Sequence, residues 1–289
     1  MLPAPNLTEP YLVCKKIKMK ITTPAPQIAK RAAVVVFSSL DTSGGAGITQ
    51  DAYFIKQGGA HPFCLQTGVA VQNNERVFKI VPTAPKCFEQ MIKSVPASIE
   101  SCVVKIGLIC NKNQPRLIKN FAESNKCAGR IILDAPIIST SGFKITTKAL
   151  SDAIVENLLV NCLLFTPNNE EVKYFGGVEN IFKMGVENIL LKAQQNDKKN
   201  NDEIYDILLN KNGERFVVKN PRLALKKQIR GTGCALISLV AGHLASALLT
   251  HKSMPLQQNL QNSVKFASNT LAKMLQTPYC VYGDCNFLP

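Results

Sequence analysis

The chain has 289 residues, of which 46% are hydrophobic and 19% charged, and this composition excludes a disordered or collagen-like protein. Of the net charge of +14, +5 lies in residues 1–31, and the rest is scattered and not interleaved with aromatic residues, so no nucleic-acid partner is expected. The same field attracts an anionic substrate. No run of eighteen apolar residues and no apolar signal segment occur, so we expect no membrane association and a cytoplasmic location.

The ten Cys include no C-x-x-C pair and are expected to be reduced thiols.

Residues 1–31 are rich in Pro, Thr and Lys and have no sustained hydrophobic period, which indicates a basic, extended N-terminal arm. Residues 32–289 contain no linker, internal repeat or low-complexity tract. We therefore expect one domain over this range.

Short apolar runs rich in β-branched residues or Leu alternate with helical stretches from residue 32 onward. Such runs are typical of strands buried on both faces of a parallel sheet. The expected strands are Ala32–Phe37, Val103–Ile106, Ile131–Leu133, Leu163–Phe165 and Ile189–Leu191. The expected helices are Ile48–Gln57, Pro85–Ser94, Gln114–Ser124, Thr146–Leu159 and Glu170–Phe175. The alternation predicts an α/β fold with a central, mostly parallel sheet flanked by helices.

The pattern changes after residue 203. Two alternating apolar arms within Ile204–Val218 flank Asn212-Gly213, which predicts a β-hairpin with a type I′ turn. Two helical stretches follow, at Cys234–Leu249 and Leu256–Leu275.

Two glycine loops are candidate binding elements. Residues 41–47 (DTSGGAG) either let the backbone approach a ligand closely or only form a tight strand-to-helix turn. Residues 230–234 (RGTGC) open a helix, whose free N–H groups and dipole favour a phosphate or a developing negative charge. The same field is expected to lower the pKa of the Cys234 thiol, so that Cys234 is a base or nucleophile; the alternative is a small buried residue.

Polar residues also follow three of the expected strands. Asn168 and Glu171 share a face of a first helical turn, where they either bind Mg²⁺ through water or form a capping box. Lys192 and Asp134 stand at strand ends, where α/β sheets place ligands, and Lys192 either neutralises phosphate there or is simply solvated.

In chain order these motifs resemble those of the ribokinase-like kinases, and most of all the hydroxymethylpyrimidine/phosphomethylpyrimidine kinases of thiamine biosynthesis. The resemblance runs from about Ala33 to about Leu249. It is carried by residues 41–48 (DTSGGAGI), Asp51, 71–73 (VQN), 105–107 (KIG), 133–134 (LD), 141–142 (SG), 166–168 (TPN) with Glu171, 191–192 (LK) and 231–234 (GTGC). The Cys in the last motif separates this branch from relatives that carry Asp there.

The resemblance implies a ribokinase-like three-layer sandwich and an ATP-dependent kinase, with Mg²⁺ as cofactor, acting on 4-amino-5-hydroxymethyl-2-methylpyrimidine and its monophosphate. It implies that Cys234 is the catalytic base and that Gln72 hydrogen-bonds the aminopyrimidine. The other implied site residues are Gly231, Thr232 and Gly233 for the anion hole; Asp51, Ala46, Ser39, Leu108 and Pro136 for the pyrimidine pocket; Lys192, Asn168 and Thr166 for the nucleotide; and Glu171 and Asp134 for the metal. The family also tends to form homodimers.

The chain departs from the family pattern after the strand that ends near Leu191. The family usually has Lys-Gly-Gly-His where this chain has Lys192-Ala193-Gln194-Gln195. Two alternatives to the pyrimidine kinase therefore stay open. One is a kinase of a pyridoxal-type vitamer, against which the pair Gln72 and Cys234 argues. The other is a kinase-fold protein that binds the pyrimidine with weak catalysis, which the two missing glycines favour.

Overall fold

The computed structural model describes residues 31–73, 76–97, 99, 102–134, 136–137, 146–195, 202–223, 229–276, 280–282 and 285–288. The chain divides into Met1–Lys30 and a compact unit, Arg31–Pro289, and only the second is described below. The expected N-terminal arm, except Arg31, and the motif at residues 141–142 lie outside the described residues.

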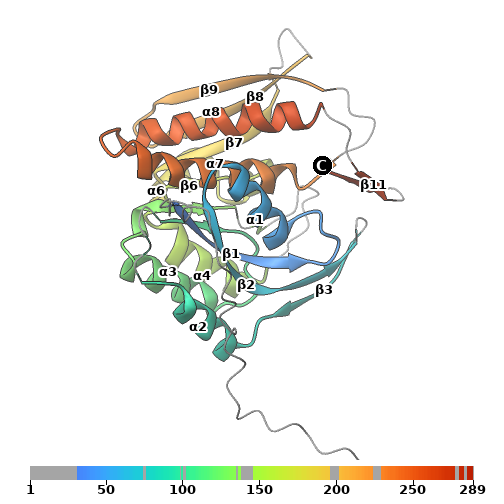
Figure 1. Ribbon diagram of the computed structural model, residues 1–289, viewed down its shortest axis with the longest axis vertical. Coiled ribbons are helices and arrows are strands. Elements are labelled where there is room, and N and C mark those ends of the chain that lie inside the picture. Colours follow the sequence, from blue (N-terminus) through green and yellow to red (C-terminus); the bar gives the residue numbers. More distant parts are fainter. Residues whose placement is uncertain are drawn as a thin grey trace, which may run out of the picture. The chain divides into compact units, whose positions relative to one another are not determined.

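A nine-stranded sheet forms the centre of the compact unit, in the order β3-β2-β1-β4-β5-β6-β7-β8-β9 (Figure 1). Six strands run parallel: β1 (Ala33–Asp41), β2 (His61–Gln72), β4 (Val103–Ile106), β5 (Ile131–Leu133), β6 (Leu164–Phe165) and β7 (Asn188–Gln194). Three antiparallel strands complete its edges: β3 (Val77–Pro82), β8 (Glu203–Asn210) and β9 (Arg215–Pro221). The mostly parallel sheet expected from the sequence is confirmed.

Helices cover both faces of this sheet, because its central strands are apolar on both sides. Alternate residues of β1 belong to different cores: Val34 and Val36 to one, Val35 and Phe37 to the other. The first core is closed by α1 (Gly47–Gln57), α7 (Thr232–Thr250) and α8 (Leu256–Met274). The second is closed by α2 (Pro85–Ser94), α3 (Gln114–Ser124), α4 (Lys148–Ile154), α5 (Asn169–Tyr174) and α6 (Val178–Lys183).

Helix α7 is the one helix of the described residues that is long and apolar enough to cross a membrane by length and composition. Its most apolar window is 61% buried inside the protein. It packs against α1, α8 and the sheet, and it is apolar on most sides because it lies in the core.

The structure corrects three expectations from the sequence. The helix expected at Thr146–Leu159 is α4 followed by one π-helical turn, Val155–Leu159. Strands β2 and β3 were not expected at all. The hairpin between β8 and β9 is confirmed, but its turn is not type I′: only Gly213 has a positive φ, and Asn210 N–H donates to the Glu214 carbonyl across a three-residue loop.

The helix at 256–275 is confirmed as α8.

A small second sheet joins the C-terminal segment to the second glycine loop. It has the order β10-β12-β11, with β10 at Ile229–Arg230, β11 at Cys280–Tyr282 and β12 at Cys285–Phe287. Arg230 pairs in parallel with Phe287. The backbone directly before Gly231 is therefore held by pairing with the chain end.

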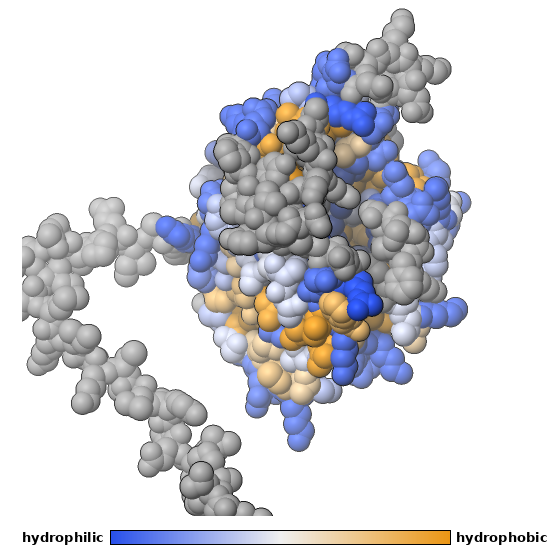
Figure 2. Space-filling view, turned by 90° about the vertical axis from the view of Figure 1, so that its right-hand side faces the viewer, coloured by the Kyte–Doolittle hydropathy of each residue, from blue (hydrophilic) through white to orange (hydrophobic). Residues whose placement is uncertain are grey.

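Apolar side chains are exposed along the edge strand β3, where Val77 and Phe78 are 52% and 54% exposed. Figure 2 looks onto the side of the molecule on which β3 lies in Figure 1, and hydrophobic and hydrophilic surfaces are both present there.

Candidate active site

The polar residues of the candidate site gather at the carboxyl ends of the parallel strands. Strand β1 ends at Asp41, β5 is followed by Asp134, β6 is followed by Thr166, and β7 carries Lys192 near its end. This edge of an open α/β sheet is where the helix N-termini and connecting loops form a ligand crevice.

The first glycine loop is folded by its own Asp41. Asp41 Oδ1 accepts hydrogen bonds from Ser43 N (2.8 Å) and Ser43 Oγ (2.7 Å), which tightens the turn into α1. Gly47 has a φ of 72°, and a Cβ there would overlap the carbonyl oxygen of Ser39. The turn therefore holds Ser39, which is buried, close to Ala46, the half-buried N-cap residue of α1.

The second glycine loop contacts the first. Gly231 is the N-cap residue of α7, with a φ of 79°, and a Cβ on it would overlap the carbonyl oxygen of Gly45. Behind Gly231, the first N–H groups of α7 belong to Thr232, Gly233 and Cys234, and such groups have no acceptor within their own helix. With the helix dipole they suit an anionic group.

Lys192 connects two strand ends with this helix N-terminus. Its Nζ donates to Asp134 Oδ1 (3.0 Å) and to the Thr166 carbonyl oxygen (3.0 Å), while Thr166 Oγ1 donates to Asp134 Oδ1 (2.6 Å). The same Nζ lies 3.7 Å from where a Cβ on Gly233 would be. The ammonium of Lys192 thus stands beside the expected anion hole. The nearby ammonium groups of Lys192 and Lys105 lower the pKa of Asp134 despite its burial.

A buried ion pair lies beneath the glycine loops. Lys105 Nζ donates to Asp51 Oδ1 (2.7 Å), and Ser238 Oγ of α7 donates to the same oxygen (2.8 Å). Both charged residues are fully buried. The charge of Asp51 raises the pKa of Lys105, so Lys105 remains an ammonium in spite of its burial.

Cys234 lies among these charges, and its protonation differs from the expectation. Burial of the thiol and the carboxylate of Asp134 raise its pKa to about 12, and the opposing effect of Lys105 and Lys192 is smaller. The expected lowering of the Cys234 pKa by the helix N-terminus is therefore wrong. In the free protein Cys234 is a neutral thiol at neutral pH.

Gln72 stands at the end of β2, and its backbone is held by the first glycine loop. Thr42 Oγ1 accepts from Gln72 N (3.0 Å) and donates to the Gln72 carbonyl oxygen (2.9 Å). Arg230 Nη1, next to the second glycine loop, donates to the Asn73 carbonyl oxygen (2.7 Å). Both glycine loops are thus connected to the strand end that carries Gln72.

Leu108 and Pro136, the expected apolar walls, are half-buried and lie shortly after the ends of the neighbouring strands β4 and β5. The Leu108 carbonyl oxygen accepts from Thr67 Oγ1 (2.6 Å), which fixes the backbone after β4.

Asn168 and Glu171 form a capping box, which was one of the two alternatives that the sequence allowed, the other being metal binding through water. Asn168 Oδ1 accepts from Glu171 N (2.9 Å), and Glu171 Oε2 accepts from Asn168 N (2.9 Å). Glu171 Oε1 also accepts from Ile137 N (2.7 Å). Glu171 thus connects the start of α5 with the segment after β5 that carries Pro136.

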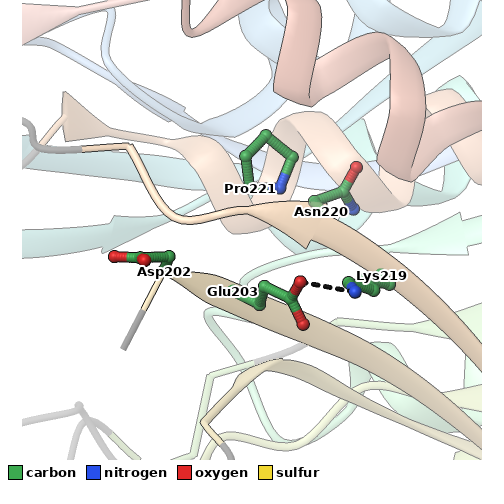
Figure 3. Close-up of a pocket in the computed structure, with 5 residues that line it drawn as sticks. All are labelled: Asp202, Glu203, Lys219, Asn220 and Pro221. Carbon is green, nitrogen blue, oxygen red and sulfur yellow. Dashed lines mark ion pairs between the residues drawn. The ribbon is translucent and has the colours of Figure 1, made fainter. Parts of the chain in front are cut away.

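A surface cavity of about 350 Å³ lies elsewhere, beside the ends of β8 and β9 (Figure 3). It is lined by Asp202, Glu203, Lys219, Asn220 and Pro221, and Glu203 forms an ion pair with Lys219 there. None of the expected site residues lines it, and it holds no nucleophile or base beside an anion-binding helix end.

Two residues of the site went unassigned in the sequence analysis. The sequence analysis named Lys105 only as part of the motif at residues 105–107, and it assigned no role to Ser238. A charged residue inside the otherwise apolar, buried run Val103–Ile106 was the signal for Lys105, since a buried Lys needs a buried partner. Ser238 had no such signal within the apolar α7.

Comparison with known proteins supports a kinase. The sequence model of the phosphomethylpyrimidine kinase family matches residues 41–278. A hydroxymethylpyrimidine/phosphomethylpyrimidine kinase from Haemophilus influenzae is 24% identical over 85% of this chain and 91% of the relative. One from Aquifex aeolicus is 29% identical over 75% of this chain and 86% of the relative.

Solved structures share the fold. A pyridoxal kinase from Staphylococcus aureus in complex with ADP aligns with a TM-score of 0.73 at 15% identity, covering 90% of this chain and 94% of that one. A phosphomethylpyrimidine kinase from Clostridium difficile aligns with a TM-score of 0.64 at 21% identity, covering 83% and 100%. The expected ribokinase-like architecture is confirmed.

Proposed function

The chain belongs to the phosphomethylpyrimidine kinase family, and on this premise we propose that it phosphorylates 4-amino-5-hydroxymethyl-2-methylpyrimidine and then its monophosphate with ATP. The observation that carries the proposal is the meeting of three groups at one sheet edge: the N-terminus of α7, the ammonium of Lys192 and the thiol of Cys234. Phosphoryl transfer needs reactants to be positioned and their charge neutralised, and these groups are suited to both.

The pyrimidine is proposed to bind between the end of β2 and the segments that follow β4 and β5. The Gln72 side-chain amide offers a donor and an acceptor, the pattern that an aminopyrimidine edge requires. Leu108 and Pro136 offer apolar contact to the ring faces. Asp51, held by Lys105 and Ser238, has its second oxygen Oδ2 buried without a hydrogen-bond partner among the described residues, so it retains acceptor capacity for a polar substrate group.

The transferred phosphoryl group is proposed to lie against the N–H groups of Thr232, Gly233 and Cys234, beside Lys192. In the free protein Lys192 is paired with Asp134, so its ammonium is already placed where phosphate charge would arrive. The Cys234 sulfur is then the acceptor for the hydroxymethyl proton. Since the Asp134 carboxylate raises the Cys234 pKa, a Mg²⁺ ion held by Asp134 would partly neutralise that carboxylate and favour the thiolate that this role needs.

Mg²⁺ fits the carboxylates at this edge. Mg²⁺ commonly uses one or two protein carboxylates, retains waters and binds the substrate phosphates, and no group of three or more ligating His, Cys, Asp or Glu occurs in the part of the chain described. Asp134, with its lowered pKa, is the residue proposed to hold it, and Glu171 would act through water because both of its oxygens accept backbone N–H groups. When bound, the ion neutralises phosphate charge.

The pyridoxal-type alternative is less well supported. The pyridoxal kinases align at 14–15% identity, which establishes the fold alone, whereas the family model and the two curated relatives all carry the pyrimidine kinase name.

The direct test is incubation with ATP, Mg²⁺ and a panel of hydroxymethyl heterocycles that includes the pyrimidine and pyridoxal, with ADP release as the readout. Pyrimidine-dependent ADP release supports the proposal. Tight pyrimidine binding without ADP release would instead identify a kinase-fold binding protein.

A further inference from the structure

Strand β7 contains a bulge at the residue that carries the phosphate-side ammonium. Leu191 pairs with Ile207 and Gln194 pairs with Tyr205, so Lys192 and Ala193 together face the single residue Asp206 of β8. A bulge of this kind bends the strand and re-aims a side chain. Leu190 belongs to the core that α7 closes, so Lys192, two residues further along β7, lies on the same face and donates to Asp134 and Thr166. The bulge begins at Lys192 and sets the course of the backbone that carries it.

The bulge leaves backbone groups that the strand ladder cannot satisfy. Ala193 has a φ of 50°, in the left-handed region, and its N–H donates to Asp206 Oδ1 (2.9 Å). The Lys192 carbonyl oxygen accepts from Gln194 Nε2 (2.9 Å). Because a non-glycine residue at this φ is disfavoured, the surrounding contacts must stabilise the conformation, and the Asp206 carboxyl supplies one of them.

The Asp206 carboxyl is itself held by a side chain of α8. It is 8% exposed, and its Oδ2 accepts a hydrogen bond from Ser268 Oγ of α8. Asn220 Nδ2 of β9 donates to the same Ser268 Oγ. Figure 1 shows α8 lying along β8 and β9. Ser268 of α8, itself held by Asn220 of β9, thus fixes the carboxyl that accepts from Ala193.

We infer that Asp206 is a positioning residue for the kinase reaction: it holds the β7 bulge and thereby places Lys192 beside the anion-binding N-terminus of α7. This inference rests on the proposed function in one respect, that Lys192 meets nucleotide phosphate. Asp206 contacts no reacting atom in this account and acts only through the backbone of Ala193.

The chain offers a matched control on the same strand. Asn210 lies on the same buried face of β8, is 9% exposed and also joins β8 to β7, since its Nδ2 donates to Asn188 Oδ1 (3.0 Å). Asn188 opens β7 and lies away from the bulge. Asn210→Ala therefore removes a buried polar contact between the same two strands without touching the backbone of Lys192.

The experiment compares Asp206→Ala, Asp206→Asn and Asn210→Ala by ATP titration, steady-state kinetics and thermal unfolding. Asp206→Ala is expected to weaken ATP binding and raise the KM for ATP about 10- to 100-fold, since a displaced ammonium is costly to a phosphate site. The KM for the pyrimidine is expected to change less than about threefold. Asp206→Asn keeps an oxygen acceptor for Ala193 N–H and should stay within about threefold of the unmodified protein for ATP. Asn210→Ala should lose thermal stability but keep its ATP affinity.

Equal ATP affinity in folded Asp206→Ala and Asn210→Ala would overturn the inference, because Asp206 would then be merely structural. If Asp206→Ala does not fold, Ser268→Ala takes its place; an unchanged ATP affinity in that folded variant would overturn the inference as well. ATP binding without pyrimidine-dependent ADP release in the unmodified protein would contradict the proposed function alone, since the titration still tests Asp206.

Discussion

Gly231 rests directly against Gly45, so that a Cβ on Gly231 would overlap the Gly45 carbonyl oxygen. The two residues lie far apart in the sequence and belong to the two glycine loops of the candidate site. Their contact joins the loop after β1, beside the proposed pyrimidine pocket, to the helix N-terminus proposed to hold the phosphoryl group.

Gly231→Ala should therefore do more damage than the strain of placing alanine at a positive φ, because the added Cβ would also push the two glycine loops apart. Gly213, in the β8–β9 turn, is the control because it also has a positive φ (87°) but nothing within 4 Å of an added Cβ. Gly213→Ala should reduce the free energy of unfolding by about 1–2 kcal/mol and leave kcat unchanged. Gly231→Ala should lose more stability and most of its activity, as measured by thermal unfolding and ADP release. Similar effects of the two changes would show that the loop contact is unimportant.

Cys234→Ser tests the catalytic base. The substitution keeps the size of the side chain, while a serine hydroxyl is much harder to ionise than a thiol, so kcat should fall by about 100-fold or more with little change in melting temperature. Near-normal turnover in the Ser variant would remove Cys234 from this role.

The raised pKa of Cys234 has a further consequence for the pH dependence. With a pKa of about 12, the thiolate fraction grows as pH rises through the neutral range, so kcat/KM should increase with pH up to the alkaline limit of protein stability. The Ser variant should lack this rise. A pH-independent kcat/KM around neutrality in the unmodified protein would contradict a free-enzyme thiol that must ionise.

Local structure at the candidate site was more predictable from the sequence than the contacts between distant parts of the chain. Local signals indicated the capping box of Asn168 and Glu171 as one of two alternatives and predicted the helix that follows Gly231, since both depend on neighbouring residues. The predicted lowering of the Cys234 pKa was wrong because burial and the Asp134 carboxylate raise it, and both effects come from distant parts of the chain. Strand β2 was missed because Gln66, Thr67 and Gly68 interrupt its apolar pattern, and its pairing with β1 is a tertiary effect.

Gln72→Leu should weaken pyrimidine binding while sparing ATP binding. Loss of the amide leaves the polar edge of the pyrimidine unpaired, which corresponds to roughly 1–3 kcal/mol, or a rise of about 5- to 150-fold in the pyrimidine Kd. The Gln72 backbone is held by Thr42, so the strand end should stay in place. Titration of a folded variant with each ligand separates the two effects, and an unchanged pyrimidine Kd would place Gln72 outside the pocket.

Ala193→Gly should stabilise the protein. Ala193 is exposed and has a φ of 50°, so glycine relieves a disfavoured conformation without removing a buried contact. After allowance for the greater freedom of the unfolded chain, the gain is about 0.5–1 kcal/mol. Adding Gln194→Gly should cancel much of it, because the Gln194 side chain donates to the Lys192 carbonyl oxygen. Thermal unfolding of the single and double variants measures these changes in stability. A single variant less stable than the unmodified protein would contradict the interpretation that Ala193 is strained.

The most direct test of the account is a competition between 4-amino-5-hydroxymethyl-2-methylpyrimidine and pyridoxal for phosphorylation by the full chain with ATP and Mg²⁺, with products identified by mass. The account predicts a pyrimidine monophosphate, then a diphosphate, and a kcat/KM for the pyrimidine about 100-fold or more above that for pyridoxal, because a site built to pair a polar edge rejects analogues that lack it. Equal or preferred phosphorylation of pyridoxal, or ADP formation that does not depend on either alcohol, would contradict it.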